Sequence, residues 1–88
     1  MRLVFSSHAW NDYLYWVESD REMLSRINGL IEECKRHPFK GRGKPEPLKG
    51  DLKGWWSRRI SREHRLVYRV AKSSATQALE IAQVRFHY

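Results

Sequence analysis

Three residues with complementary chemistry are spread along this chain: Glu46 in the middle, Arg65 some twenty positions later, and His87 next to the last residue. A carboxylate can accept a proton, an imidazole can donate one near neutral pH, and a guanidinium can hold a phosphate. Cleavage of RNA without a metal needs a base for the ribose 2′-OH, an acid for the leaving 5′ oxygen, and a cation beside the phosphate. The three residue types therefore predict acid–base chemistry on a phosphodiester.

Glu46 lies between two prolines in the stretch "GKPEPLKG". Pro45 and Pro47 restrict the backbone on both sides, so we expect the carboxylate to be held rigidly, as a general base requires. An exposed glutamate more commonly only offsets the charge of nearby lysines. Taken alone, Glu46 leaves both interpretations open.

Basic residues dominate the composition, with 17 Lys and Arg against 10 Asp and Glu and a net charge of +7. Most of them fall between Lys35 and Lys72, which predicts an anionic partner, most often a nucleic acid. Trp55 or Trp56 could stack on a base, although a tryptophan is more commonly a core residue. The basic residues expected to bind the RNA backbone are Lys44, Lys49, Arg59 and Arg62.

The sequence contains no run close to the roughly 18 apolar residues of a membrane-spanning helix and no signal-peptide pattern. We therefore expect a cytoplasmic protein with no membrane partner. Cys34 is the only cysteine and falls on the apolar stripe of an expected helix, so we assign it to the core. The four histidines lack the short spacings of zinc ligands, and neither a metal nor any other cofactor is predicted.

The 88 residues fit a single domain, 1–88. Alternation predicts a first strand near residues 3–5, Ser7 can cap one helix, and Asp20 can cap a second helix that Pro38 ends. Residues 38–54 predict a long loop with one short strand near Leu48. Three antiparallel strands are expected in "WWSRRI", "RLVYRVA" and "ALEIAQVRF". The result is an α+β fold with two N-terminal helices packed on one face of a mostly antiparallel sheet.

Alternation also sorts the residues of the expected strands by face. Leu66, Tyr68 and Val70 share one face, and Arg65, Val67 and Arg69 share the other. On the last strand, Gln83, Arg85 and His87 would share a face, so that this strand carries the chain end into a polar site. An ordinary solvated face would give the same pattern.

The motifs "GKPEPLKGDLKGWWSRRI", "EHRLVYRV" and "FHY", together with "WNDYLYW" near the N-terminus, occur in one order along nearly the whole chain. In these motifs the sequence resembles the YoeB toxins of bacterial toxin-antitoxin pairs, which belong to the RelE superfamily. The resemblance implies a RelE-like fold and a ribosome-dependent endoribonuclease that cuts mRNA in the ribosomal A site. It also implies a homodimer and neutralisation by a YefM-type antitoxin.

By motif position, the resemblance assigns the general base to Glu46, phosphate stabilisation to Arg65 and the general acid to His87, and it places Tyr88 in the same site. Phe86 departs from the tyrosine that relatives often carry. The alternative is a nucleic-acid-binding domain without catalysis, or a ParE-like toxin that inhibits a protein target. The presence of all three chemical groups argues against that alternative.

Overall fold

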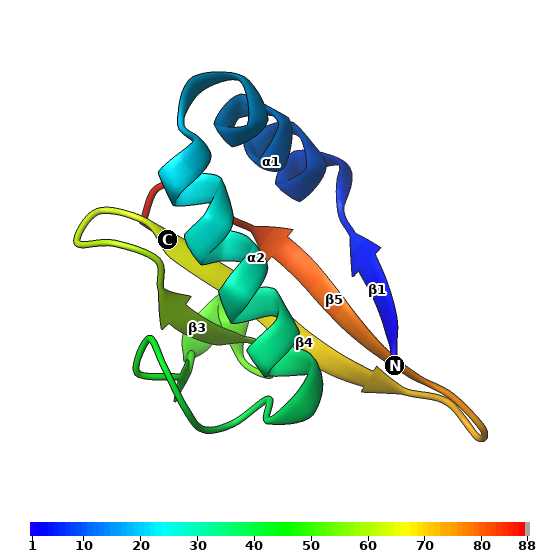
Figure 1. Ribbon diagram of the computed structural model, residues 1–88. Coiled ribbons are helices and arrows are strands. Elements are labelled where there is room, and N and C mark those ends of the chain that lie inside the picture. The colour runs from blue at the N-terminus through cyan, green and yellow to red at the C-terminus, as the bar shows by residue number, and fades with distance from the viewer. Residues whose placement is uncertain (88) are drawn as a thin grey trace.

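Figure 1 shows the computed structural model, which describes residues 1–87 as two helices lying on one face of a five-stranded sheet. The helices are α1 (Ser7–Ser19) and α2 (Arg21–Arg36). The strands are β1 (Arg2–Phe5), β2 (Glu46–Pro47), β3 (Trp56–Arg59), β4 (Arg65–Lys72) and β5 (Gln77–Gln83), with a short 3₁₀ helix at Gly50–Leu52. This arrangement confirms the α+β fold that the sequence predicts.

The sheet has the strand order β1-β5-β4-β3-β2. β1 pairs with β5 in parallel, and every other pairing is antiparallel, which agrees with the expected mostly antiparallel sheet. The parallel pair arises because both helices intervene between β1 and the rest of the sheet, and parallel neighbours need such a crossover. The short strand β2 forms one edge of the sheet, and it carries Glu46.

The helix boundaries follow from two capping side chains. Ser6, rather than the expected Ser7, caps α1, because its hydroxyl accepts a hydrogen bond from the Ala9 N–H at 3.0 Å. Asp20 has two roles: its own N–H donates to the Trp16 carbonyl at the end of α1, and its carboxylate accepts from the Met23 N–H at the start of α2. An N-cap of this kind contributes about 1 kcal/mol, which fixes the sharp turn between the helices.

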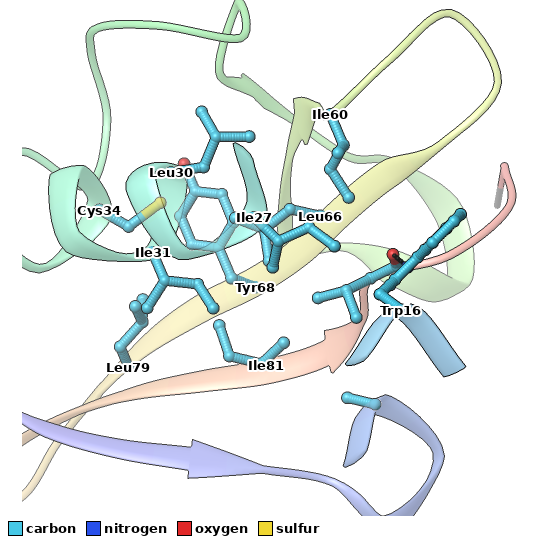
Figure 2. Close-up of a cluster of buried hydrophobic side chains, with 12 residues drawn as sticks. Trp16, Ile27, Leu30, Ile31, Cys34, Ile60, Leu66, Tyr68, Leu79 and Ile81 are labelled. Atoms are coloured by element: carbon cyan, nitrogen blue, oxygen red, sulfur yellow. Dashed lines mark hydrogen bonds between the residues drawn. The ribbon is translucent and has the colours of Figure 1, made fainter. Parts of the chain in front are cut away.

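The core lies between the helices and the sheet (Figure 2). Leu66 and Tyr68 of β4 point toward α2 and are fully buried, as their alternation predicts, and Cys34 is fully buried as well. Burying one large apolar side chain contributes about 1.5–3 kcal/mol, so this layer holds the sheet against the helices. The other residues labelled there are Trp16, Ile27, Leu30, Ile31, Ile60, Leu79 and Ile81, and the cluster also contains Ala9 and Val84.

The last strand ends at Gln83, so the prediction that it continues to Phe86 is wrong. The reason lies in residue 84, whose backbone groups bond to side chains of α1 instead of to a neighbouring strand. The Val84 N–H donates to Asp12 Oδ2 at 3.2 Å, and the Val84 carbonyl accepts from Trp16 Nε1 at 2.8 Å. Arg85 and His87 therefore do not continue the face of Gln83, and residues 84–87 form a separate tail.

Candidate active site

The face of the sheet that the helices leave uncovered carries the first two candidate residues. The register places Glu46 opposite Ser57 and Ser57 opposite Val67, so these three side chains share one face. Arg65 lies two residues before Val67 on the same strand and therefore projects from that face too. Two strand spacings, about 10 Å, separate β2 from β4, so Glu46 and Arg65 lie on opposite sides of β3.

Arg65 is 9% exposed and its side chain is held by the turn that precedes it. Its Nη1 donates to the carbonyl oxygens of Ser61, Arg62 and His64 at 2.9, 3.2 and 3.1 Å. Within residues 1–87 the side chain donates through this one nitrogen. A guanidinium carries five N–H donors, and a planar fork of this kind suits a bidentate contact with a phosphate.

The tail brings His87 to the same end of β4. The Arg65 N–H donates to the Phe86 carbonyl at 3.1 Å, so His87 follows a residue that is bonded directly to Arg65. Phe86 has a φ of +64°, a left-handed conformation that is uncommon for a residue with a side chain and that turns the chain here. His87 is exposed, and Tyr88 lies outside the described residues.

The Arg85 side chain stacks within the tail. Its guanidinium carbon lies 3.5 Å from the centroid of the Tyr15 ring and 4.4 Å from that of the Phe86 ring. Guanidinium groups stack favourably on aromatic faces, so Arg85 joins the tail to α1. The expected face shared by Arg85 and His87 is replaced by this packing.

Glu46 is exposed on β2, and the segment before it is fixed against β3. The Arg59 N–H donates to the Gly43 carbonyl at 2.7 Å. Gly43 has a φ of +82°, and a Cβ added there would lie 2.9 Å from the Arg59 carbonyl oxygen. Only glycine accommodates this approach, so the rigid placement expected from the prolines has a second cause in Gly43.

Arg58, which is not among the residues predicted for the site, is completely buried. Its guanidinium donates to five acceptors: the Tyr68 hydroxyl, the Glu33 carboxylate, and the carbonyl oxygens of His37, Lys40 and Arg42. It thereby ties the start of the loop that leads to Glu46 to the core. The signal was present in the sequence, because Trp56, Arg58 and Ile60 alternate and two of the three are apolar.

Burial and charge around Arg58 set three pKa values. Burial raises the pKa of Cys34 to about 11 and that of Tyr68 to about 12. Burial also acts to raise the pKa of Glu33, but the hydrogen bonds from the Arg42 N–H and guanidinium and the charges of Arg42 and Arg58 outweigh it and lower that pKa. These shifts follow from burial and charge pairing inside the fold, and the raised pKa of Cys34 indicates that its thiol is not a nucleophile.

The four predicted RNA-binding residues are all exposed: Lys44, Lys49, Arg59 and Arg62. Arg59 lies directly opposite Arg65 in the β3–β4 register, and the Arg62 carbonyl accepts from Arg65, so these two lie beside the candidate site. Lys44 and Lys49 flank β2. Together the four extend the positive charge on both sides of the candidate residues.

The tryptophans differ from each other in role. Trp56 packs against Phe39 at a ring centroid distance of 4.7 Å and contacts the core, which agrees with the core role weighed against base stacking. The Trp55 ring stacks with the Arg69 guanidinium at 4.4 Å. Base stacking by Trp55 remains a prediction.

Residues 1–87 contain neither a cluster of metal-ligating side chains nor a membrane-spanning helix. In this part of the chain no three or more His, Cys, Asp or Glu side chains are grouped so that they could hold a metal ion. Neither helix there is long and apolar enough to cross a membrane.

Comparison with known proteins defines the class of this fold and site. The chain has TM-scores of 0.95 and 0.88 against a YoeB/ParE toxin from Agrobacterium tumefaciens and the YoeB dimer from Staphylococcus aureus. Identity is 56% and 40%, with 100% of this chain covered in both and 100% and 98% of the other chains. The fold is therefore that of a YoeB/ParE-type toxin.

Sequence relatives narrow that class. The chain is 57% identical to Toxin YoeB of Streptomyces coelicolor and 53% identical to Toxin YoeB of Escherichia coli K12, and both matches cover 100% of each chain. The family model for the YoeB-like toxin of the bacterial type II toxin-antitoxin system matches residues 5–88. The chain belongs to this YoeB-like toxin family.

Proposed function

We propose that this protein is an endoribonuclease that cuts mRNA in the ribosomal A site by attack of the ribose 2′-OH on the adjacent phosphate. Glu46 takes the proton from the 2′-OH, Arg65 stabilises the negative charge that develops on the phosphate, and His87 protonates the leaving 5′ oxygen. The products are a 2′,3′-cyclic phosphate and a free 5′-OH. Tyr88 is assigned to the same site from its motif position.

One observation carries this proposal: the hydrogen bond from the Arg65 N–H to the Phe86 carbonyl. It joins the residue expected to hold the phosphate to the tail that bears the expected acid, although the two are far apart in the sequence. Glu46 projects from the same sheet face across β3. A base on one side of a bound phosphate and an acid on the other is the arrangement that in-line displacement of a 5′ oxygen requires.

The expected partners follow from the family and from the charge. One chain of a solved YoeB-YefM complex from Staphylococcus aureus is 39% identical to this chain, with a TM-score of 0.88. We therefore propose a YefM-type antitoxin as a partner here. By the same comparison with the solved YoeB dimer we propose a homodimer. The net charge of +7 suits binding to mRNA and the ribosome in the cytoplasm.

The mechanism is tested with Glu46→Gln and His87→Gln in single-turnover cleavage of an mRNA positioned on ribosomes. Each variant should cleave about 10²- to 10⁴-fold more slowly, the usual contribution of one acid or base, while ribosome binding is retained. Glu18→Gln on α1 and His37→Gln after α2 are exposed matched controls and should cleave at the wild-type rate. Wild-type rates for both Glu46→Gln and His87→Gln would refute the assignment and favour a toxin that acts on a protein target.

The chemistry has a separate test in the substrate. A message with a 2′-deoxy or 2′-O-methyl nucleotide at the scissile position should bind but resist cleavage, because the attacking oxygen is absent or blocked. The unmodified message should yield a fragment that ends in a 2′,3′-cyclic phosphate. Cleavage of the 2′-deoxy message at the normal rate would rule out attack by the 2′-OH.

A further inference from the structure

His64 holds the tail at the point where it turns toward His87. The Phe86 N–H donates to His64 Nδ1 at 2.7 Å. A backbone N–H can only donate, so Nδ1 carries the lone pair and His64 is neutral in this arrangement, with its proton on Nε2. The imidazole is therefore an acceptor that fixes the residue immediately before His87.

Packing fixes the orientation of the His64 ring. Its centroid lies 4.8 Å from that of Trp16 in an edge-to-face arrangement and 5.8 Å from that of Phe86. Trp16 is itself buried and donates its indole N–H to the Val84 carbonyl. The ring that receives the Phe86 N–H is thus held by the same tryptophan that anchors the start of the tail.

The tail depends on such contacts because it has left the sheet. Residue 84 is bonded to α1, and the Phe86 carbonyl accepts from the Arg65 N–H at the start of β4 and from Gln83 Nε2 at the end of β5. The left-handed φ of Phe86 is not a conformation that a free chain end with a phenylalanine prefers. The contacts of Phe86 must therefore impose it, and the bond to His64 is the one made by its N–H.

We propose that His64 is a positioning residue for the reaction, and that its neutral imidazole sets the direction in which the tail presents His87. This role rests on the proposed function, in which His87 is the acid. His64 acts through Phe86. The His64 carbonyl oxygen, which accepts a hydrogen bond from Arg65 Nη1, belongs to the backbone, so this bond is kept when the His64 side chain is replaced.

Two variants of equal shape isolate the hydrogen bond. In His64→Asn the side-chain oxygen can occupy the place of Nδ1 and accept the Phe86 N–H, whereas His64→Leu keeps the branched shape and has no acceptor. One neutral hydrogen bond shifts an equilibrium by about a factor of 2 to 10. In His64→Leu, the single-turnover cleavage rate at saturating enzyme should fall about three- to tenfold, while the enzyme concentration that gives half of the maximal rate stays unchanged. His64→Asn should stay within about twofold of the wild type.

A second measurement needs no RNA. Exchange of the Phe86 amide hydrogen, followed by NMR, should be about tenfold faster in His64→Leu than in the wild type and nearly unchanged in His64→Asn. His87→Gln should slow cleavage by about 10²- to 10⁴-fold without altering this exchange rate. His37→Leu, at an exposed histidine, should alter neither measurement.

The two measurements separate the two hypotheses. A wild-type protein that does not cleave positioned mRNA would refute the proposed function, while faster Phe86 exchange in His64→Leu alone would still support the hold of His64 on the tail. Equal cleavage by His64→Leu and His64→Asn, in a protein whose wild type cleaves, would overturn the positioning role. Equal Phe86 exchange in the two variants would overturn the hydrogen bond on which that role depends.

Discussion

Replacing Arg58 by methionine should destabilise the fold more than any other single change at an arginine of the sheet. Arg58 is fully buried and donates five hydrogen bonds, three of them to the carbonyl oxygens of His37, Lys40 and Arg42. Methionine fills much of the same space but donates none. The carbonyls belong to a surface loop and can partly rehydrate, so we take the lower end of the cost of a lost partner, about 1 kcal/mol for each.

The sum is about 3 kcal/mol from the three carbonyls, before any loss at Glu33 or Tyr68. A chain of 88 residues has a total stability of about 4–13 kcal/mol, at about 0.05–0.15 kcal/mol per residue. Arg58→Met should therefore remove a large part of the free energy of unfolding. The free energy of unfolding of Arg58→Lys should lie between those of the wild type and Arg58→Met, because one ammonium group has three donors and cannot reach all five acceptors.

Urea unfolding followed by tryptophan fluorescence measures this loss directly, since the chain contains four tryptophans. With a slope of about 1.5 kcal/mol per molar urea, Arg58→Met should lower the midpoint by about 2 M. Arg59→Met is the matched control, because Arg59 is exposed on the opposite face and should change stability by no more than about 0.5 kcal/mol. At an unchanged slope, a shift of 0.5 M in the midpoint corresponds to about 0.8 kcal/mol. A midpoint for Arg58→Met within about 0.5 M of the wild type would therefore refute the predicted loss of stability.

Two further predictions concern groups near Arg58. The pKa of Glu33 is lowered in the folded protein, so its ionised form adds stability above the usual pKa of 4.5, and this stability is lost as the pH falls through the folded pKa. Glu33→Gln should therefore weaken the fall in the free energy of unfolding at acid pH, measured by urea unfolding at a series of pH values. An unchanged pH dependence would contradict this. With a pKa of about 11, the Cys34 thiol should resist alkylation at pH 8 in the folded protein and react once urea unfolds it, as mass spectrometry can show, whereas rapid labelling of the folded protein would contradict its burial.

The parts of the fold that could be predicted from the sequence are those with a regular period. Alternation in β4 assigned Leu66 and Tyr68 to the core and Arg65 to the open face, and the structure confirms each of these assignments. The Asp20 cap was also predictable, because a local side-chain bond to the Met23 N–H is encoded within four residues. Such features need no knowledge of what lies across the fold.

The parts that could not be predicted depend on contacts between distant segments. The end of β5 at Gln83 is determined by Asp12 and Trp16 of α1, which take the backbone bonds of Val84. Alternation alone has no information about these partners, so the sequence pattern extended the strand too far. The burial of Arg58 has a related cause: its alternation with Trp56 and Ile60 is visible in the sequence, but the acceptors that allow an arginine to be buried there come from distant segments.

Arg58 and the tail both bear on how the candidate site is held. The proposed base lies on the two-residue edge strand β2, which pairs only with β3, and the proposed acid lies on a tail outside the sheet. Each is held further by a buried or partly buried side chain that bonds to main-chain groups: Arg58 on the loop before Glu46, and His64 on the residue before His87. Because such segments are the first to open in a folded protein, loss of either contact should disturb the candidate site before it unfolds the central strands.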